Sequence, residues 1–430
     1  MISINRLTLM RIFYSATLSI LLPALFVRLW IKGRKAPLYR QRWAERIGIF
    51  DSKNCQPHGI CFHCVSVGET LAAVPLIKRV QSDYPELQIT VTSTTPTGSA
   101  RVKAAFGDSV FHVYLPFDTP GGVRRFFTHV KPRLLVIMET ELWPNLLHHA
   151  KHQQCRTLLA NARLSARSAK GYGSKIATLS QGMMDDITHI AAHHRDDGAR
   201  FCQLGLNPDK LSVIGSIKFD IHIEARLIKQ AKQLKKQWAN ERPVWVVGST
   251  HNGEDQLILQ AFDQIKAQFP NLLLVIVPRH PERFKQVAQM IEHAGLKMQK
   301  RSTVGLAEPD TEVILGDTMG ELMLFWALAD VAFVGGSLVE RGGHNPLEPA
   351  AFGVPVITGQ HVFNFSAIYK LLEQQNGVVL VDDATALAQS VLNLLQDDAE
   401  REHIGQNGLT VVEQNRGAME RLHHQISQLL

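Results

Sequence analysis

Short apolar runs alternate with segments of helical spacing along most of the chain after residue 58. In the first half the runs are rich in β-branched residues, and segments such as 71–84 and 142–151 carry the helical pattern between them. This alternation is typical of a parallel sheet covered by helices on both faces. The predicted strands of the first half are residues 59–66, 88–93, 110–115, 133–138, 157–161, 188–192 and 211–214.

The pattern breaks at residues 221–242, which are rich in Lys, Gln and Ala and end at Pro243, and then restarts. We expect a linker at 221–242, an N-terminal Rossmann-like domain at 36–220 and a C-terminal one at 243–430. Ligands of such doubly wound α/β sheets bind at the carboxyl ends of the strands, so two facing domains would form a cleft between them. The predicted strands of the second half are residues 244–247, 272–277, 312–315, 331–334, 354–357 and 378–381.

The first 35 residues have a different character. Residues 12–27 carry no charge, residues 29–31 continue the apolar stretch, and a basic flank follows. About 20 apolar residues span a bilayer, and the positive-inside rule places the basic flank and the domains after it in the cytoplasm. We therefore expect a single-pass anchor, with a helix lying on the membrane surface as the alternative. A cleaved signal peptide is disfavoured because no small-residue cleavage site follows.

Composition agrees with a membrane-attached globular protein. The chain has 430 residues, 45% of them hydrophobic and 20% charged, and a formal net charge of +7. Much of the basic charge lies at the membrane flank and not in an aromatic-studded groove, which disfavours a nucleic-acid binder. Five cysteines are too few, and odd in number, for a disulfide framework. Cys61 and Cys64 lie three apart on a predicted strand and point to opposite faces, so we expect structural thiols and no metal site.

Polar clusters follow the predicted strands of the first half. Gly68 permits a tight turn or close ligand approach, and Glu69 is either a favourable first-turn carboxylate or a general base. Glu139 and Glu141 follow a later strand and suit acid/base work, hydrogen bonds to sugar hydroxyls, or simple helix capping.

The second half has more such clusters, and no Walker loop or dinucleotide fingerprint is present. Arg279 is a natural phosphate partner, and free amides at residues 319–321 are a second one. Glu348 can accept hydrogen bonds from ribose hydroxyls. Each cluster has an ordinary loop interpretation, but their convergence at strand ends favours a nucleotide site. Its candidate residues are Ser249, Thr250, Pro278, Arg279, Met319, Gly320, Glu321, Asn345 and Glu348.

Taken in order, these motifs resemble the Kdo (3-deoxy-D-manno-octulosonic acid) transferases of Gram-negative bacteria. The resemblance covers nearly the whole chain. Its most specific parts are Glu-Thr-Glu-Leu-Trp-Pro-Asn at 139–145 and Gly-Gly-His-Asn-Pro-Leu-Glu-Pro at 342–349, supported by Ser-Val-Gly-Glu at 66–69.

The resemblance implies a GT-B architecture and an enzyme of lipopolysaccharide synthesis at the inner membrane. It implies CMP-Kdo as donor, a lipid A precursor as acceptor, Glu69 as base, inversion at the anomeric carbon and no cofactor or metal. Glu139 is the stand-in base, and Glu141 and Lys218 are further cleft residues. A different nucleotide sugar, or a non-catalytic membrane-attached nucleotide-binding module, remain alternatives.

Overall fold

The computed structural model describes residues 6–174 and 176–430 and divides them into two compact units. The first unit contains the chain up to Ile217 together with Arg416–Leu430, and the second contains Lys218–Asn415. Each unit is built on a seven-stranded sheet whose strand pairs are all parallel. The expectation of two Rossmann-like α/β units is confirmed.

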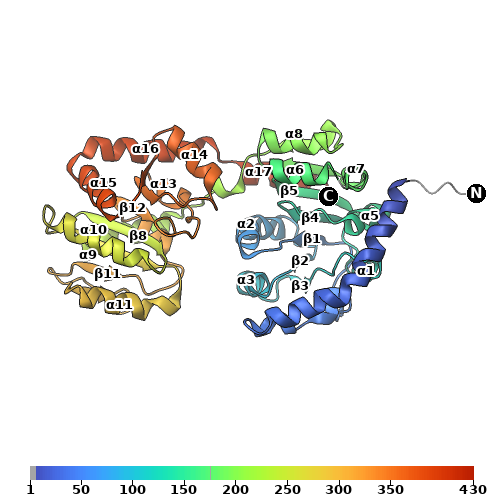
Figure 1. Cartoon of the computed structure of the whole chain (residues 1–430), viewed down its shortest axis with the longest axis horizontal. Coiled ribbons are helices and arrows are strands. Elements are labelled where there is room, and N and C mark those ends of the chain that lie inside the picture. Colours follow the sequence, from blue (N-terminus) through green and yellow to red (C-terminus); the bar gives the residue numbers. More distant parts are fainter. Residues whose placement is uncertain (1–5, 175) are drawn as a thin grey trace, which may run out of the picture. The chain divides into compact units, whose positions relative to one another are not determined.

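In the first unit the strand order is β3-β2-β1-β4-β5-β6-β7 (Figure 1). All seven predicted strands are present, with shifted ends. They are β1 (Ile60–His63), β2 (Ile89–Ser93), β3 (Phe111–Tyr114), β4 (Leu134–Met138), β5 (Arg156–Ala162), β6 (His189–Ala192) and β7 (Leu211–Val213).

Helices cover both faces of this sheet, and several begin at side-chain caps. Ser66, Thr95 and Thr119 each accept a hydrogen bond from a backbone amide of the following helix. The helices of the unit are α1 (Arg6–Lys32), α2 (Val67–Asp83), α3 (Pro96–Phe106), α4 (Pro120–Val130), α5 (Pro144–His152), α6 (Ala166–Tyr172), α7 (Ala177–Asp186), α8 (Arg195–Gln203) and α17 (Ala418–Gln428). Short 3-10 turns are η1 (Pro37–Arg40), η2 (Trp43–Ile47), η3 (Pro208–Lys210) and η4 (Ile217–Phe219). The last of these turns begins in this unit and ends in the second.

The two cysteines near β1 show that both faces of this sheet are buried. Cys61 and Cys64 are fully buried, and they belong to different apolar clusters on opposite sides of the sheet. All five cysteines are free thiols, and the described residues contain no group of three or more metal-binding side chains. The opposite orientation predicted for this pair is therefore confirmed.

In the second unit the strand order is β10-β11-β9-β8-β12-β13-β14. The sequence pattern missed β10 (Met298–Lys300), a three-residue edge strand without an apolar run. The other strands are β8 (Val244–Thr250), β9 (Leu273–Pro278), β11 (Val313–Leu315), β12 (Val331–Val334), β13 (Val356–Gly359) and β14 (Val378–Val381). The helices are α9 (Ala225–Trp238), α10 (Glu254–Lys266), α11 (Phe284–His293), α12 (Leu322–Trp326), α13 (Leu347–Ala350), α14 (Ser366–Gln374), α15 (Ala384–Gln396) and α16 (Asp398–Gln414), with η5 (Pro281–Arg283).

Two expected boundaries differ from the compact units. The segment 221–242 does not form a free linker, because α9 buries Leu234 and Trp238 in the core of the second unit. The expected C-terminal domain of 243–430 loses its last residues, because α17 buries Leu422 and Ile426 in an apolar cluster of the first unit. Figure 1 shows α17 in red beside β5.

Helix α1 is the apolar segment of the expected anchor, and residues 1–5 of that segment lie outside the described residues. The helix is 27 residues long and contains an 18-residue stretch apolar enough to cross a membrane. The helix also contacts the first unit along its length. Ser15 donates to Asn145 at 3.0 Å, and the Phe26 ring centroid lies 5.2 Å from that of Trp43 and 5.7 Å from that of Phe117.

Candidate functional site

The candidate site residues of the first unit gather where its strand order reverses. The chain builds β1, β2 and β3 to one side and then returns to place β4 against the other side of β1. Ligands of open α/β sheets bind beside the carboxyl ends of the strands at such a switch point. Glu69 follows β1, whereas Glu139 and Glu141 follow β4, so the three carboxylates lie on both sides of the switch point.

Glu69 lies in the first turn of α2, with only 9% of its surface exposed. Its Oε2 accepts a hydrogen bond from the Val65 amide at 2.8 Å, and its own amide donates to the Ser66 hydroxyl. Burial raises the pKa of Glu69, the hydrogen bonds from Ser66 and Val65 oppose this, and the negative charge of Glu139 adds to the rise. The helix-capping role is thus present, and the raised pKa also suits a general base.

Glu139 and Glu141 occupy the strand exit opposite Glu69. Glu139 has a left-handed backbone with φ of 57°, a conformation that is uncommon for residues other than glycine and is found at functional sites. Glu141 accepts a hydrogen bond from the Trp143 indole at 3.0 Å. Burial, with the nearby charge of Glu69, raises the pKa of Glu141 to about 7. The structure therefore brings the three predicted carboxylates into mutual electrostatic reach.

Gly68 has no conformational need to be glycine. Its φ lies outside the left-handed region, and an added Cβ would meet only the Ser66 hydroxyl, at 3.8 Å. The tight-turn interpretation is therefore wrong, whereas the open space above the backbone agrees with close approach of a ligand.

The second unit repeats this arrangement with different chemistry. Its order reverses between β8 and β12, and β9 and β11 continue on the far side of β8. The predicted nucleotide residues lie at the ends of these four neighbouring strands or follow them. Because all four strands are parallel, their carboxyl ends lie along one edge of the sheet. The predicted clusters are therefore brought together within this unit.

Arg279 and Glu348 are the charged side chains of this edge best suited to a ligand. Among the described residues, the Arg279 guanidinium has no hydrogen bond or ion pair, although it lies close enough to act on the charge of Glu348. Glu348 accepts weak hydrogen bonds from Asn345 at 3.3 Å and from the Trp326 indole at 3.4 Å. Burial raises the pKa of Glu348, and these bonds together with Arg279 oppose the rise.

Three predicted residues lie within the ends of β8 and β9, and all three are buried. Thr250 is fully buried and donates its hydroxyl to Asp255 at 2.6 Å, so it does not offer a side chain to a ligand. Pro278 ends β9 as a buried residue. Ser249 is also buried, with φ of 61°, and lies at the register shift of β8 between Gly248 and Thr250.

The loop before α12 offers backbone donors in place of a helix dipole. Met319 and Gly320 lie in this loop, and their amides have no hydrogen-bond partner among the described residues. The side chain of Glu321 is already held by Arg301 and Thr318. Because α12 has only five residues, its dipole is small, and the loop amides themselves are the donors available to an anion.

Sequence reasoning missed Glu254 and a histidine pair in the same unit. Glu254 is fully buried and accepts hydrogen bonds from four backbone amides, those of His251, Gly336, Ser337 and Leu338. It therefore joins the loops after β8 and β12. The Nε2 atoms of His251 and His344 lie 2.9 Å apart. His251 ends the predicted cluster after β8 and His344 lies within the cluster at 342–349, and this was the available signal.

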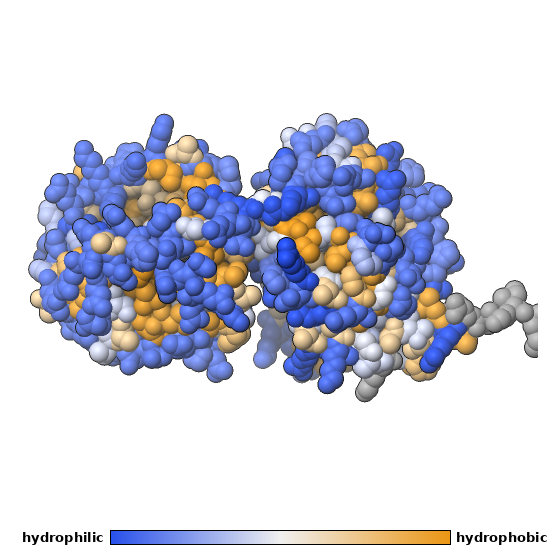
Figure 2. All heavy atoms as spheres, turned by 90° about the horizontal axis from the view of Figure 1, so that it is seen from above, coloured by the Kyte–Doolittle hydropathy of each residue, from blue (hydrophilic) through white to orange (hydrophobic). Residues whose placement is uncertain are grey.

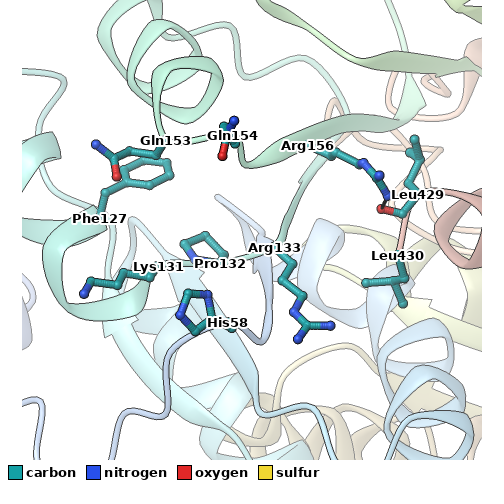
Figure 3. Close-up of a pocket in the computed structure, with 10 residues that line it drawn as sticks. All are labelled: His58, Phe127, Lys131, Pro132, Arg133, Gln153, Gln154, Arg156, Leu429 and Leu430. Carbon is teal, nitrogen blue, oxygen red and sulfur yellow. Dashed lines mark hydrogen bonds between the residues drawn. The ribbon is translucent and has the colours of Figure 1, made fainter.

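A cavity of about 360 Å³ lies at the opposite, amino edge of the first sheet (Figure 3). Its basic lining residues, among them His58, Lys131 and Arg133, precede β1 and β4, and Arg156 donates to the Leu429 carbonyl at 2.8 Å. Helices α4 and α5 end beside it, and basic side chains compensate the negative ends of helices. This cavity contains none of the predicted site residues.

Two family models match the two halves of the chain. A family model described as 3-deoxy-D-manno-octulosonic-acid transferase (kdotransferase) matches residues 41–221, and one described as glycosyl transferases group 1 matches residues 249–411. The chain is 48% identical over 414 residues to the 3-deoxy-D-manno-octulosonic acid transferase of Haemophilus influenzae, covering 96% of this chain and 97% of that protein.

A second relative and a solved structure extend the comparison. The 3-deoxy-D-manno-octulosonic acid transferase of Bordetella pertussis is 34% identical, with 95% of this chain and 96% of that protein covered. A glycosyltransferase structure from Rickettsia africae matches with a TM-score of 0.54 at 12% identity over 87% of this chain and 98% of that one, a likeness of fold alone. With nearly complete coverage by relatives and motifs at both switch points, this chain belongs to the 3-deoxy-D-manno-octulosonic acid (Kdo) transferase family of glycosyltransferases.

Proposed function

We propose that this Kdo transferase uses CMP-Kdo as donor and a lipid A precursor, lipid IVA, as acceptor, with inversion at the anomeric carbon. The observation that carries the proposal is the contrast between the two switch points. The first unit presents clustered carboxylates, whereas the second presents a guanidinium and loop amides that have no partner among the residues the structure describes. Carboxylates suit the activation of a hydroxyl, and basic donors suit a departing phosphate.

In the proposed reaction Glu69 takes the proton of an acceptor sugar hydroxyl. The freed oxygen attacks the anomeric carbon of Kdo, the bond from that carbon to the phosphate oxygen breaks, and CMP departs with the electron pair. Attack from the face opposite the leaving phosphate inverts the configuration. The raised pKa of Glu69 makes it a stronger base than an ordinary exposed glutamate.

The donor site is proposed for the second unit. Arg279 and the amides of Met319 and Gly320 would contact the single phosphate, and Glu348 and Asn345 would contact the ribose. CMP-Kdo carries one phosphate, so these donors can balance the charge of the leaving group, and we propose that the reaction requires no cofactor or metal. Addition of a chelator is then expected to leave the transfer rate unchanged.

We further propose that α1 attaches the enzyme to the cytoplasmic side of the inner membrane. Its side contacts favour a helix at the membrane surface over a single-pass span. The contacts run from Leu7, beside Gly182, to Phe26, a distance of about 28 Å along a helix axis. That is nearly the whole thickness of the hydrocarbon core, about 30 Å, and a helix packed on a water-soluble unit over this length cannot also be surrounded by lipid.

The direct test is incubation of the purified protein with CMP-Kdo and tetraacylated lipid A precursor, followed by mass spectrometry of the lipid and analysis of the new anomeric centre. We expect a mass gain of one or more Kdo units with inverted configuration. Transfer from a UDP-sugar, without transfer from CMP-Kdo, would show instead that the donor is another nucleotide sugar. CMP binding without any lipid product would identify a non-catalytic module.

A further inference from the structure

The two imidazole rings of His251 and His344 form a hydrogen-bonded pair across the switch point of the second unit. His251 follows β8, and His344 lies in the loop after β12. The rings are parallel to within 2°, with centroids 5.1 Å apart and the two Nε2 atoms 2.9 Å apart. Neither Nδ1 atom has a hydrogen-bond partner within the part of the chain that the structure describes.

The backbone between the strands is shaped to admit this pair. Gly336 has φ of 73°, and an added Cβ would lie 3.0 Å from the His344 ring and 3.3 Å from the His251 ring. The Gly336 amide is held by Glu254, which also holds the His251 amide. The position therefore requires glycine both for its backbone conformation and for the space that the rings occupy.

The hydrogen bond between the rings limits how many protons the pair can hold. One Nε2 must donate and the other must accept, so the neutral pair has one Nδ1–H and one bare Nδ1. A single added proton goes to the bare Nδ1 and leaves the inner bond intact, with two N–H groups directed outward. A second proton would place two N–H groups face to face and break the bond. The pair can therefore take up one proton and, in doing so, gain an outward donor.

The surroundings of the pair are mostly basic. Arg279, His280, Arg283 and Arg341 all act on the charge of His251. Of these, Arg283 is paired with Asp255. Neither Glu254 nor Glu348 is bonded to the pair, because Glu254 accepts from four backbone amides and Glu348 accepts from Asn345 and Trp326. Such a cluster of positive groups without a free carboxylate is an anion site.

Without an anion, this environment keeps the pair neutral. Burial, assisted by His280 and the arginines, lowers the pKa of His251 to about 4. Burial, assisted by His251 and Arg279, lowers the pKa of His344 to about 4. A bound phosphate would oppose the effect of the arginines and raise the affinity of the pair for a proton.

We propose that the His251–His344 pair contacts the phosphate of the sugar donor and takes up one proton when that phosphate binds. The added N–H then donates a hydrogen bond to the phosphate oxygen that leaves with the nucleotide, where negative charge grows as the bond to the sugar breaks. This inference rests on the proposed nucleotide-sugar function and adds two residues to its donor site.

The test uses the full-length protein and the methyl ester of CMP. The free monoester CMP would itself titrate near pH 6, whereas the phosphate of its methyl ester, like that of a sugar donor, keeps one charge. Calorimetric titration in two buffers of different ionisation enthalpy gives the number of protons taken up. We expect uptake that approaches one proton as the pH falls from about 8 toward about 5.5, with affinity tightening by up to about tenfold per pH unit.

Three variants assign the proton. The double variant His251→Gln/His344→Gln should lose the uptake, whereas His280→Gln, which removes a neighbouring ring that is not bonded to the pair, should keep it. His403→Gln on the exposed face of α16 is the remote control. Binding by the wild-type protein without proton uptake would overturn the inference and leave the proposed function standing, and uptake that is lost in His280→Gln alone would also overturn it. Failure of the ester to bind at all would refute the proposed donor and this inference together.

Discussion

Glu69 is the residue on which the proposed transfer chemistry depends most. Glu69→Gln keeps the size of the side chain and an oxygen able to accept from the Val65 amide, but it removes the base. We expect the turnover of Kdo transfer to fall by roughly 10²–10⁴-fold, with CMP affinity unchanged because the donor residues belong to the second unit. Initial rates at saturating donor and acceptor measure this effect.

Two controls separate catalysis from helix capping. Glu86→Gln makes the same chemical change at an exposed position of the first unit and should have no effect on the rate. Ser66→Ala removes the N-cap hydrogen bond of α2 and should cost about 1 kcal/mol of stability. It also removes a hydrogen bond that acts on the Glu69 carboxyl, but it keeps the base, so turnover should fall far less than in Glu69→Gln. If Glu69→Gln turned over at the wild-type rate, Glu139 would become the candidate base.

Arg279 should determine donor affinity. Arg279→Ala removes the unpaired guanidinium, and the loss of a charged hydrogen bond, about 1.5–3 kcal/mol, predicts a rise in the donor KM of about 10–100-fold. Arg401→Ala is a control in the same unit, because Arg401 is paired with Asp398 and lies on α16, which carries none of the predicted donor residues. Equal donor KM values for Arg279→Ala and the wild type would contradict this placement.

The raised pKa of Glu141 predicts that the stability of the protein depends on pH. Its folded-state pKa of about 7 lies above the ordinary 4.5, so the folded protein holds this proton more tightly than the unfolded chain does. Stability from this group is present below the unfolded pKa and is lost as the pH rises through about 7. Glu141→Gln should therefore weaken the fall in the free energy of unfolding between about pH 5 and about pH 8 by on the order of 1 kcal/mol, which is measured as a smaller drop in melting temperature. If the variant and the wild type lost the same stability between these pH values, Glu141 would not be a buried carboxyl group that ionises near pH 7.

Single residues show where sequence reasoning succeeds. The opposite orientation of Cys61 and Cys64 follows from strand geometry alone, and the grouping of Glu69 with Glu139 follows from strand order. Thr250 was assigned to a ligand because it follows a strand, but its hydroxyl is used by Asp255. The His251–His344 bond was not predictable, because it joins residues 93 positions apart, and only the tertiary structure brings them together.

At the scale of elements, the core strands were readable because their β-branched runs are buried on both faces. The exceptions have a common cause. Strand β10 is a polar edge strand, and α9 and α17 are amphipathic helices whose partners lie elsewhere in the chain. Periodicity reveals that such a helix has an apolar face but not which core receives it. Tertiary packing therefore decided the boundaries that the sequence pattern misplaced.

Helix α17 gives a direct test of those boundaries. Leu422 is fully buried in an apolar cluster of the first unit, so Leu422→Ala should cost about 2–5 kcal/mol. Hydrogen exchange should show the loss of protection in β1 and β2 of that unit. Leu371→Ala on α14, where the side chain is 38% exposed, is the control and should have little effect. Loss of protection confined to β8 and β9 would instead support the originally expected domain boundary.

At the scale of the whole molecule, packing against the first unit does not explain the apolar surface of α1 that faces away from that unit. Figure 2 shows a mostly hydrophilic surface with smaller apolar patches on the face in view. Along α1, by contrast, large apolar side chains are between 45% and 78% exposed; they are Leu9, Ile12, Phe13, Ile20, Leu21, Val27, Trp30 and Ile31. An apolar stripe of this kind, beside a basic flank, suits an anionic membrane surface.

The position of Thr8, near the start of α1, distinguishes the two membrane arrangements. If α1 lies on the cytoplasmic surface, Thr8→Cys should react with a membrane-impermeant maleimide only after the inner membrane is opened, because the whole helix stays on one side. If α1 spans the membrane, this cysteine should react in intact cells. The background would carry Cys55→Ser and Cys202→Ser, which removes the two half-buried thiols and leaves the three buried ones. Glu402→Cys, at an exposed position of α16, reports the cytoplasmic side and should react only after opening in either case.

We expect Thr8→Cys to show the same labelling pattern as Glu402→Cys, because contacts from Leu7 to Phe26 hold α1 against the first unit. Labelling of Thr8→Cys alone in intact cells would show that those contacts give way to a single-pass span.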